Sequence, residues 1–191
     1  MTKLILATNN AHKVKEITQI LKGKFDEIIS LKQANIDVDP EENGTTFLAN
    51  AQIKAREISK HTSFAVLADD TGLCVDALDG MPSIYSARYA GVHGDDKANR
   101  VKLLKELENK LDRSAHFETV VVLHYPDGKE VWATGKVDGK ILFQEDGENG
   151  FGYDSIFYCN DLEKSFGVAT DEEKNSVSHR ARAIYNLLEK L

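Results

Sequence analysis

The sequence is poor in cysteine and proline, with two and three of these among its 191 residues. Cys74 and Cys159 lie far apart, so they do not form the closely spaced pair that is typical of a metal site. In the strand-like stretch GLCVDAL, Cys74 is most simply a small buried hydrophobic side chain. Two isolated cysteines are consistent with a reducing compartment, and we expect a cytoplasmic protein.

Long hydrophobic runs are also missing. No apolar stretch approaches the roughly 18 to 20 residues that a transmembrane helix requires. Met1-Thr2-Lys3 leads directly into strand-like sequence, so we expect no signal peptide. The sequence therefore predicts no association with a membrane.

A surplus of positive charge is absent, since the formal net charge is −7. Proteins that bind a nucleic-acid polymer usually have a basic excess, so this class of partner is not expected. A nucleotide is not excluded, because a triphosphate needs only a few local cations and a divalent metal ion, which acidic side chains can hold. The composition permits a small anionic ligand without requiring one.

The hydrophobic pattern predicts strands and helices that alternate within one domain, residues 1–191. Strands are expected at 3–8, 64–69, 116–124, 130–143 with a break near Gly139, and 153–158. Helices are expected at 11–22, 46–60, 95–111 and 177–190. The Asp-Gly turn in YPDGK, residues 125–129, predicts a hairpin. Interleaved elements with a central hairpin indicate an α/β protein with a mixed sheet.

Two of the expected helices carry apolar side chains at spacings of three and four, which predict their buried faces. In helix 95–111 these side chains are Val101, Leu104, Leu107 and Leu111. In helix 177–190 they are Ala181, Tyr185 and Leu188. We expect both stripes to face the core.

The stretch LILATNNAHKVKEI places a polar turn between a strand and a helix. Such a turn presents backbone N–H groups and the positive end of the helix dipole. Thr8, Asn9 and Asn10 add side-chain donors, and Lys13 follows one turn into the helix. The stretch is compatible with phosphate binding, although it lacks the GxxxxGK[ST] pattern of a P-loop. The alternative is an ordinary capped helix with an exposed lysine.

The stretch DVDPEENGTTFLANAQIKAREI, residues 37–58, brings carboxylates to the start of a helix. Glu41 or Glu42 could hold Mg²⁺, which prefers one or two carboxylates together with substrate oxygens. The helix dipole alone is an alternative reason for acidic residues at this position. Lys54 lies on the polar side of the helix and either reaches a phosphate or is solvated.

In FAVLADDTGLCVDAL, Asp69, Asp70 and Thr71 follow an apolar strand. The ends of strands are where open α/β sheets bind their ligands. Because side chains alternate along a strand, the two carboxylates should point to opposite sides if the strand continues that far. One would then face a cleft while the other supports the turn. The alternative is an Asp-rich turn without a function.

Two later stretches contain groups that suit a purine. In GENGFGYDSIF, glycines allow close backbone approach, and Phe151 offers a face on which a base could stack. In EEKNSVSHRARA, Lys174, His179 and Arg180 are donors that match an acceptor-rich edge such as that of a keto purine. The alternatives are a tight turn whose aromatic side chains belong to the core, and a histidine on the surface of a helix.

Taken together, six stretches resemble the inosine triphosphate pyrophosphatase family. They occur in the family's order and span residues 6–180: LATNNAHKVKEI, EENGTTFLANAQIKA, ADDTGLCVDAL, GMPSIYSARYAG, NGFGYDSIF and EEKNSVSHR. The resemblance implies Mg²⁺-dependent hydrolysis of XTP, ITP and dITP to the nucleoside monophosphate and pyrophosphate. It also implies a homodimer, and an elongated central mixed sheet flanked by helices, with an active-site cleft between two lobes.

The resemblance also assigns roles to residues of this chain. Asp70 would be the catalytic carboxylate and a metal ligand, together with Glu41 or Glu42. The residues implied to bind substrate are Thr8, Asn9, Asn10, Ala11, His12, Lys13, Lys54 and Thr71 on the phosphate side, and Phe151, Gly152, Tyr153, Asp154, Lys174, His179 and Arg180 around the base.

The chain departs from the family's usual pattern at several positions. Asn9 and Ser83 stand where glycine is common, and Ser155 stands where proline is common. Asparagine tolerates a left-handed backbone better than most residues, so the turn at Asn9 can persist. Two other functions remain open from the sequence: hydrolysis of modified pyrimidine triphosphates, and a nucleotide-sensing module without turnover.

Overall fold

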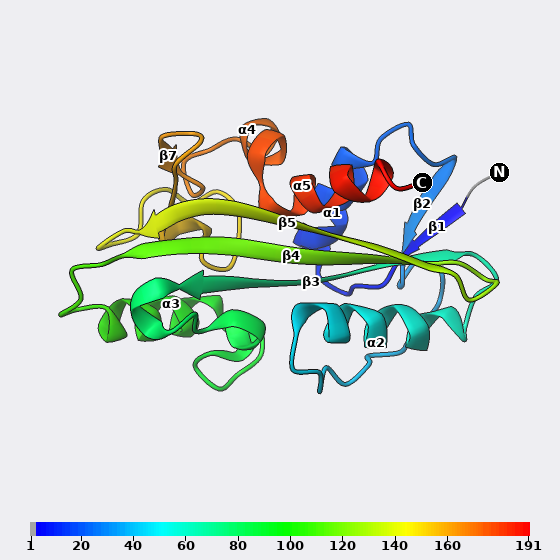
Figure 1. Ribbon diagram of the computed structural model, residues 1–191, viewed down its shortest axis with the longest axis horizontal. Helices are drawn as coiled ribbons and strands as arrows, with labels where there is room; N and C mark the ends of the chain where they lie inside the picture. Colours follow the sequence, from blue (N-terminus) through cyan, green and yellow to red (C-terminus); the bar gives the residue numbers. More distant parts are fainter. Residues whose placement is uncertain (1–2) are drawn as a thin grey trace. The chain divides into compact units, whose positions relative to one another are not determined.

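The computed structural model describes residues 3–191, which form an α/β fold (Figure 1). Met1 and Thr2, which entered the signal-peptide prediction, lie outside the described residues. The strands are β1 (Lys3–Leu6), β2 (Glu27–Ser30), β3 (Ala65–Val75), β4 (Ser114–His124), β5 (Glu130–Ile141), β6 (Phe157–Cys159) and β7 (Lys164–Ser165). The α-helices are α1 (Ala11–Ile20), α2 (Phe47–Ser59), α3 (Asp96–Glu106), α4 (Asp171–Val177) and α5 (His179–Leu188). Short 3-10 helices lie at Asp76–Leu78, Ser83–Arg88 and Asp154–Ile156.

All seven strands belong to one sheet, in the order β2-β1-β3-β4-β5-β6-β7. β1 pairs in parallel with both β2 and β3, whereas β6 pairs in antiparallel fashion with both β5 and β7. The sheet is therefore mixed, which confirms the prediction of an α/β protein with a mixed sheet. The sequence did not predict β2 and β7, which are short.

The chain forms two compact units, each assembled from separate segments. Unit 1 contains Met1–Asp70, Thr119–Gly135 and Arg180–Leu191, and unit 2 contains Thr71–Glu118 and Lys136–His179. The chain passes from one unit to the other within β3, β4 and β5, and again at the start of α5 between His179 and Arg180. That residues 1–191 act as a single domain stays a prediction.

The core of unit 1 lies between its strands and its helices. Leu4 and Leu6 of β1 pack in one cluster with Ile17 of α1 and Ile184 of α5. α1 and α5 lie on one side of these strands, and α2 lies on the other (Figure 1). Side chains that alternate along β1 and β3 therefore point toward different helices.

The core of unit 2 is rich in aromatic side chains. The ring of Phe117 lies 4.7 Å from that of Phe157, which lies 5.2 Å from Phe166. Leu73 of β3 and Leu103 of α3 belong to the same cluster and are fully buried. These contacts join β3, β4, β6 and α3 into one packed unit.

Several predicted boundaries were wrong. β3 does not end at 69 but continues to Val75, so Asp69, Asp70 and Thr71 lie inside a strand. β5 is unbroken at Gly139, which pairs with Cys159 of β6. A Cβ at Gly139 would lie 2.1 Å from the carbonyl oxygen of Tyr158, so this glycine permits close strand approach rather than a break.

The helix expected at 177–190 also differs from the prediction. The structure has α4 and α5 in this region, separated at Ser178, whose backbone is extended. Tyr185, expected to face the core, is 46% exposed. The stripe expected in 95–111 is only partly right. Leu107 is buried as predicted, but Val101 and Leu111 are exposed, Leu111 lies beyond the end of α3, and Leu103 is buried instead.

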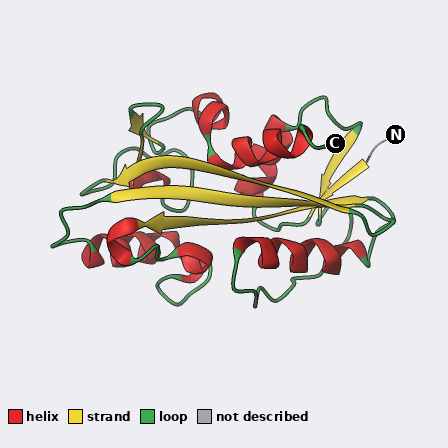
Figure 2. Cartoon of the chain, viewed as in Figure 1, coloured by secondary structure: helices red, strands yellow, loops and turns green. Residues whose placement is uncertain are grey.

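The predicted hairpin is confirmed (Figure 2). The N–H of Tyr125 donates to the carbonyl oxygen of Lys129 over 2.9 Å, which closes the turn between β4 and β5. Within the described residues, no helix is both long and apolar enough to cross a membrane.

Candidate active site

The polar turn after β1 caps α1. The side chain of Asn10 accepts hydrogen bonds from the N–H groups of His12 and Lys13, at 2.9 and 3.2 Å. The N–H of Asn10 in turn donates to the hydroxyl of Thr8. Asn9, Asn10, Ala11 and His12 are exposed. Asn9 is not among the described residues that have a positive φ, so this turn does not depend on a glycine.

The alternative for this stretch was an ordinary capped helix with an exposed lysine. Lys13 is not exposed in this way. Its ammonium lies 2.8 Å from Oδ2 of Asp69, and the side chains are 16% and 1% exposed. Asp69 comes from the middle of β3, and it points to the side of the sheet that α1 covers. The pair connects the first turn of α1 to the strand.

Arg180, at the start of α5, joins the same group. Its Nε lies 3.5 Å from Oδ2 of Asp69, and its Nη1 donates to Glu16 of α1. Glu16 and Arg180 are both buried. Lys13, Asp69, Arg180 and Glu16 thus form a buried chain of alternating charges within unit 1.

Asp70 points the other way and contacts α2. Its Oδ2 accepts from the side-chain amide of Asn50 over 3.0 Å, and its Oδ1 lies 3.7 Å from the ammonium of Lys54. Lys54 also lies 3.2 Å from Oε1 of Glu42. The prediction that Asp69 and Asp70 point to opposite sides of the strand is confirmed.

The surroundings give the two neighbouring carboxyls opposite acidities. Burial raises the pKa of Asp70 to about 6, although the charges of Lys54 and Lys13 oppose this change. Burial acts on Asp69 too, but the charges of Lys13, Arg180 and Lys54 outweigh it and hold the pKa of Asp69 far below its usual range. Paired carboxyls whose pKa values are pushed apart are typical of acid–base sites.

The two lysines also differ. Burial lowers the pKa of Lys13 despite the charge of Asp69. For Lys54 burial acts in the same direction, but the charges of Asp70, Asp69 and Glu42 outweigh it and raise the pKa. Lys54 therefore carries a positive charge at neutral pH.

The residues around Lys54 fit a magnesium ion. Glu42 and Asp70 direct their carboxylates to one ammonium group, so a small cation between them would be bound by two hard oxygen ligands. Glu41, the alternative ligand, is exposed, and its backbone carbonyl oxygen accepts a hydrogen bond from the N–H of Asn43. Among residues 3–191, no group of three or more His, Cys, Asp or Glu could hold a metal ion. Mg²⁺ does not need such a group, because it keeps water and substrate oxygens as ligands.

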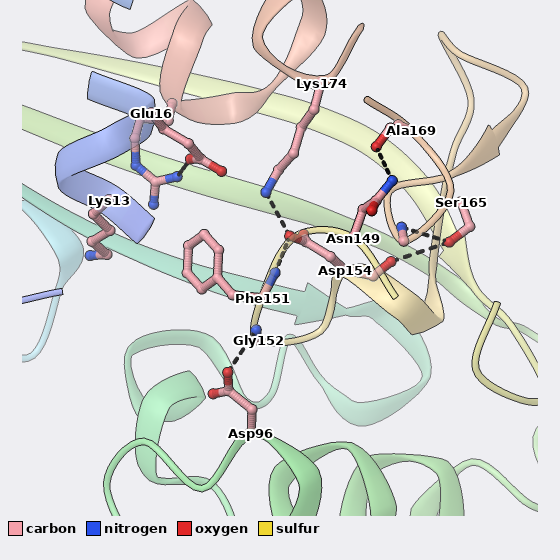
Figure 3. A network of polar contacts seen from close by, with 12 residues as sticks. Lys13, Glu16, Asp96, Asn149, Phe151, Gly152, Asp154, Ser165, Ala169 and Lys174 are labelled. Atoms are coloured by element: carbon pink, nitrogen blue, oxygen red, sulfur yellow. Dashed lines mark hydrogen bonds and ion pairs between the residues drawn. The ribbon is translucent and has the colours of Figure 1, made fainter. Parts of the chain in front are cut away.

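Unit 2 contains the second set of predicted residues. The ammonium of Lys174 lies 2.6 Å from Oδ2 of Asp154 and 4.8 Å from the ring centre of Phe151 (Figure 3). The same carboxylate accepts from the N–H of Phe151 over 2.8 Å. Lys174 and Asp154 are buried, and Phe151 is half-buried. The turn and α4 thus present an aromatic face beside a cation.

His179 is buried rather than on the surface. It is 3% exposed and stacks on Phe117, with ring centres 4.7 Å apart and an angle of 17° between the ring planes. Tyr153 is also buried, and its hydroxyl donates to the carbonyl oxygen of Ser86. Thr71 lies in β3 as the first residue of unit 2.

Two buried polar residues, Glu16 and Asn50, were not predicted from the sequence to belong to the site. Glu16 lies three positions after Lys13 and so shares a helix face with it, a spacing that could have signalled a common environment. Asn50 lies on α2, four positions before Lys54. It is fully buried and connects Asp70 to the N–H of Gly44.

Comparisons with known proteins agree over the whole chain. A model described as the Ham1 family matches residues 4–190. A dITP/XTP pyrophosphatase of Clostridium perfringens is 49% identical over 199 aligned positions, covering 100% of this chain and 98% of the relative. One from Haemophilus ducreyi is 44% identical, with coverages of 100% and 98%.

Solved structures show the same similarity. The Staphylococcus aureus Ham1 protein has a TM-score of 0.86 at 42% identity, with coverages of 99% and 97%. A HAM1 protein from Coxiella burnetii has a TM-score of 0.88 at 35% identity, and each chain is covered fully. The fold and the sequence therefore point to one family.

Proposed function

Because the chain belongs to the Ham1 family, we propose that it hydrolyses the non-standard purine nucleoside triphosphates XTP, ITP and dITP. The products are the nucleoside monophosphate and pyrophosphate, and the reaction removes deaminated purines from the nucleotide pool. The observation that carries the proposal is the pair Asp69 and Asp70, adjacent carboxyls of opposite acidity between two buried lysines. Full-length relatives named dITP/XTP pyrophosphatase support the choice of substrate.

The phosphates would be bound by residues of unit 1. The capped start of α1, residues 8–13, presents backbone and side-chain donors at the surface, and a helix start favours an anion. Lys13 and Lys54 would stabilise the negative charge that develops on the phosphates. Both ammonium groups are already held by carboxylates, so little reorganisation is needed when the substrate arrives.

We propose Mg²⁺ as the cofactor, with Asp70 and Glu42 as its protein ligands. When bound, the ion neutralises phosphate charge as a Lewis acid. Glu42 is preferred to Glu41 because Glu42 shares Lys54 with Asp70, whereas Glu41 is exposed.

Asp70 would act as the general base. A pKa of about 6 lies close to neutral pH, where a carboxylate can take a proton from water and still be ionised in most molecules. Asn50 fixes one oxygen of Asp70 by a hydrogen bond and leaves the other toward Lys54. The activated water attacks at the α–β linkage, and pyrophosphate leaves.

The purine would be bound by residues of unit 2. Phe151 offers a face for stacking, and Lys174 and His179 offer donors for the 6-keto group of the base. Arg180, which belongs to unit 1, was also predicted to bind the base, and we retain that prediction although Arg180 forms ion pairs with Glu16 and Asp69. Adenine has an amino group in place of the 6-keto oxygen, so a hydrogen-bond donor of the base would face the donors of the protein. A mismatch of this kind weakens binding by about ten- to a hundredfold.

Three further features form part of the proposal. One nucleotide would use both sets of residues, in an active-site cleft between two lobes of an elongated sheet, as the family resemblance implies. The resemblance also implies a homodimer. A cytoplasmic location follows from the proposed role in the nucleotide pool.

A product assay tests this function. Purified protein with Mg²⁺ is given XTP, ITP, ATP and GTP in parallel, and pyrophosphate is measured separately from orthophosphate. We expect pyrophosphate from XTP and ITP, with ATP and GTP slower by about a hundredfold. Orthophosphate would overturn cleavage at the α–β linkage. If no purine gives product, the same assay with modified pyrimidine triphosphates tests the first alternative, and tight nucleotide binding without any product would indicate a nucleotide-sensing module.

A further inference from the structure

Helix α3 holds the turn that carries Phe151. Oδ2 of Asp96 accepts from the N–H of Gly152 over 2.8 Å, a contact drawn in Figure 3. Nη1 of Arg100 donates to the carbonyl oxygen of Gly152, also over 2.8 Å. Asp96 and Arg100 are four residues apart, so they lie on one face of the helix. This face offers one acceptor and one donor to the two backbone polar groups of a single residue.

Gly152, the residue held by Asp96 and Arg100, has an unusual backbone conformation. Gly152 has a φ of +60°, the left-handed region that favours glycine. It lies before the 3-10 helix at Asp154–Ile156, where no strand ladder is available to bind its polar groups. The side chains of α3 therefore supply the hydrogen bonds that regular structure would otherwise make.

Arg100 connects this residue to the rest of the same loop. Its Nε lies 3.1 Å from Oε1 of Glu145. The other oxygen of Glu145 accepts from the hydroxyl of Ser155 over 3.1 Å. Arg100 is thus shared between Gly152 and Glu145, on either side of the glycine-rich turn. Its side chain is 18% exposed, so water competes only partly for these contacts.

The opposite side of the turn is held by Asp154. Its carboxylate accepts from the N–H of Phe151, and its own N–H donates to the carbonyl oxygen of Phe151. Phe151 is therefore fixed through its own backbone and through that of Gly152. Phe151 as a whole is half-buried, and the ammonium of Lys174 lies over its ring.

We infer that Asp96 and Arg100 are positioning residues for recognition of the purine. They place the ring of Phe151 by holding Gly152, and they do not themselves touch the base. The inference rests on the proposed function, in which Phe151 stacks on the base. It adds two residues of α3, outside every stretch that indicated the function, to those that determine how well a purine binds.

Substitution of Asp96 gives a paired test. Asp96→Ala removes the acceptor of the Gly152 N–H, whereas Asp96→Asn keeps a side-chain oxygen there. We expect Asp96→Ala to raise the KM for XTP and ITP about tenfold, with kcat changed by less than about twofold. Asp96→Asn should restore a KM within about threefold of the wild-type value. Lys105→Ala, an exposed position on the same helix, is the control and should change neither constant.

Two measurements separate positioning from a general loss of structure. Inorganic tripolyphosphate has no base, so its inhibition constant should be the same for wild type and Asp96→Ala. Hydrogen exchange of the Gly152 amide should accelerate in Asp96→Ala but not in Lys105→Ala. Arg100→Ala should raise the KM in the same way, because it removes the donor to the Gly152 carbonyl oxygen.

The outcomes are distinct. If wild type releases no pyrophosphate from purine triphosphates, the proposed function fails, and the purine-positioning role fails with it. If wild type is active but Asp96→Ala keeps a normal KM, the inference alone is overturned, whether or not hydrogen exchange accelerates. A fall in kcat with a weakened tripolyphosphate inhibition would also overturn it, since that pattern indicates a structural role. A raised KM with unchanged tripolyphosphate inhibition supports it.

Discussion

At the scale of single residues, Asp69 and Asp70 differ in the charges that their carboxylates meet. Asp69 faces Lys13 and Arg180, whereas Asp70 faces Asn50 and, at a greater distance, Lys54. The negative charge of Asp69 is therefore balanced by two neighbouring cations, whereas Asp70 is buried with only one cation at a greater distance. This difference predicts different consequences for the same substitution at the two positions.

Asp70→Asn should remove activity while the protein stays folded. The change removes the proposed general base, so we expect kcat to fall by about a hundred- to ten-thousandfold. Because burial raises the pKa of Asp70 to about 6, its ionised form, which predominates at pH 7, is less favourable in the folded protein than in the unfolded one. The amide should therefore not lower the melting temperature, which calorimetry at pH 7 would measure. Full turnover with Mg²⁺ would show that Asp70 is not the base.

Asp69→Asn should mainly reduce stability. It leaves the charges of Lys13 and Arg180 buried without their shared carboxylate, a change that typically costs about 3–5 kcal/mol. Urea unfolding at pH 7 would measure the difference from wild type. Asp70→Asn serves as the matched control, since it makes the same chemical change one residue away. Equal stability of the two variants would contradict the charge chain described here.

The sequence could predict that the two acids point to opposite sides, because the alternation of side chains along a strand is local. It could not predict which one meets the lysines, because Lys13 and Arg180 come from the two ends of the chain. Glu16 was missed for a similar reason. A glutamate among lysines on a helix usually indicates a solvated face, and only the arrival of Arg180 from α5 makes it a buried partner.

At the scale of elements, α2 is attached to the β4–β5 hairpin by one carboxylate. Glu130 at the start of β5 accepts two hydrogen bonds from Arg56, at 2.7 and 2.8 Å, and one from Gln52 at 3.0 Å. Nδ1 of His124 lies 3.1 Å from the same carboxylate. α2 also carries Asn50 and Lys54, so Glu130 helps to fix the helix that contacts Asp70.

This attachment should depend on pH. Hydrogen bonds from Arg56, which outweigh the effect of burial, and from His124 lower the pKa of Glu130 to about 2. A carboxyl whose pKa is lower in the folded state stabilises the protein above its unfolded pKa of 4.5, and this contribution is lost as the pH falls toward 2. Because Arg56 is largely exposed, we expect Glu130→Gln to cost only about 1–2 kcal/mol at pH 7.

Urea unfolding of wild type and Glu130→Gln at a series of pH values between 7 and 2.5 would measure this contribution. The difference between the two proteins should be constant above about pH 5 and should shrink as the pH falls below 4. Glu27→Gln is a suitable control, since the side chain of Glu27, which pairs with Lys3, is 55% exposed against 15% for Glu130. A difference that is independent of pH would show that the ionised form of Glu130 is not what holds the helix.

Elements with strong local signals could be predicted from the sequence, and those defined by distant contacts could not. The hairpin at YPDGK was predicted because the Asp-Gly turn encodes it within five residues. The end of β3 was not, because Asp69 and Asp70 look like a turn unless their distant cationic partners are known. The buried face of α3 was also predicted wrongly, because one of its buried positions holds the polar residue Asn99. The side-chain oxygen of Asn99 accepts a hydrogen bond from the N–H of Ala90.

At the scale of the whole molecule, the division into units could not be read from the sequence. Each unit is assembled from segments that are far apart in the chain, and no proline- or glycine-rich linker marks a boundary. The chain instead crosses between the units inside β3, β4 and β5, at residues 70–71, 118–119 and 135–136, and again at the start of α5, at residues 179–180. All four crossings lie inside regular elements.

This connectivity predicts one cooperative unfolding transition. Loss of unit 1 would remove the hydrogen-bonded neighbours of β3, β4 and β5 over part of their length, and the remaining parts of these strands belong to unit 2. Trp132, the single tryptophan, lies in unit 1, so its fluorescence reports on that unit, while far-UV circular dichroism reports on all helices and strands. We expect the two urea transitions to coincide, and Asp69→Asn to move both to lower urea by the same amount. A fluorescence change that precedes the loss of circular dichroism would show that unit 1 unfolds alone, and would contradict the view that the continuous strands couple the two units.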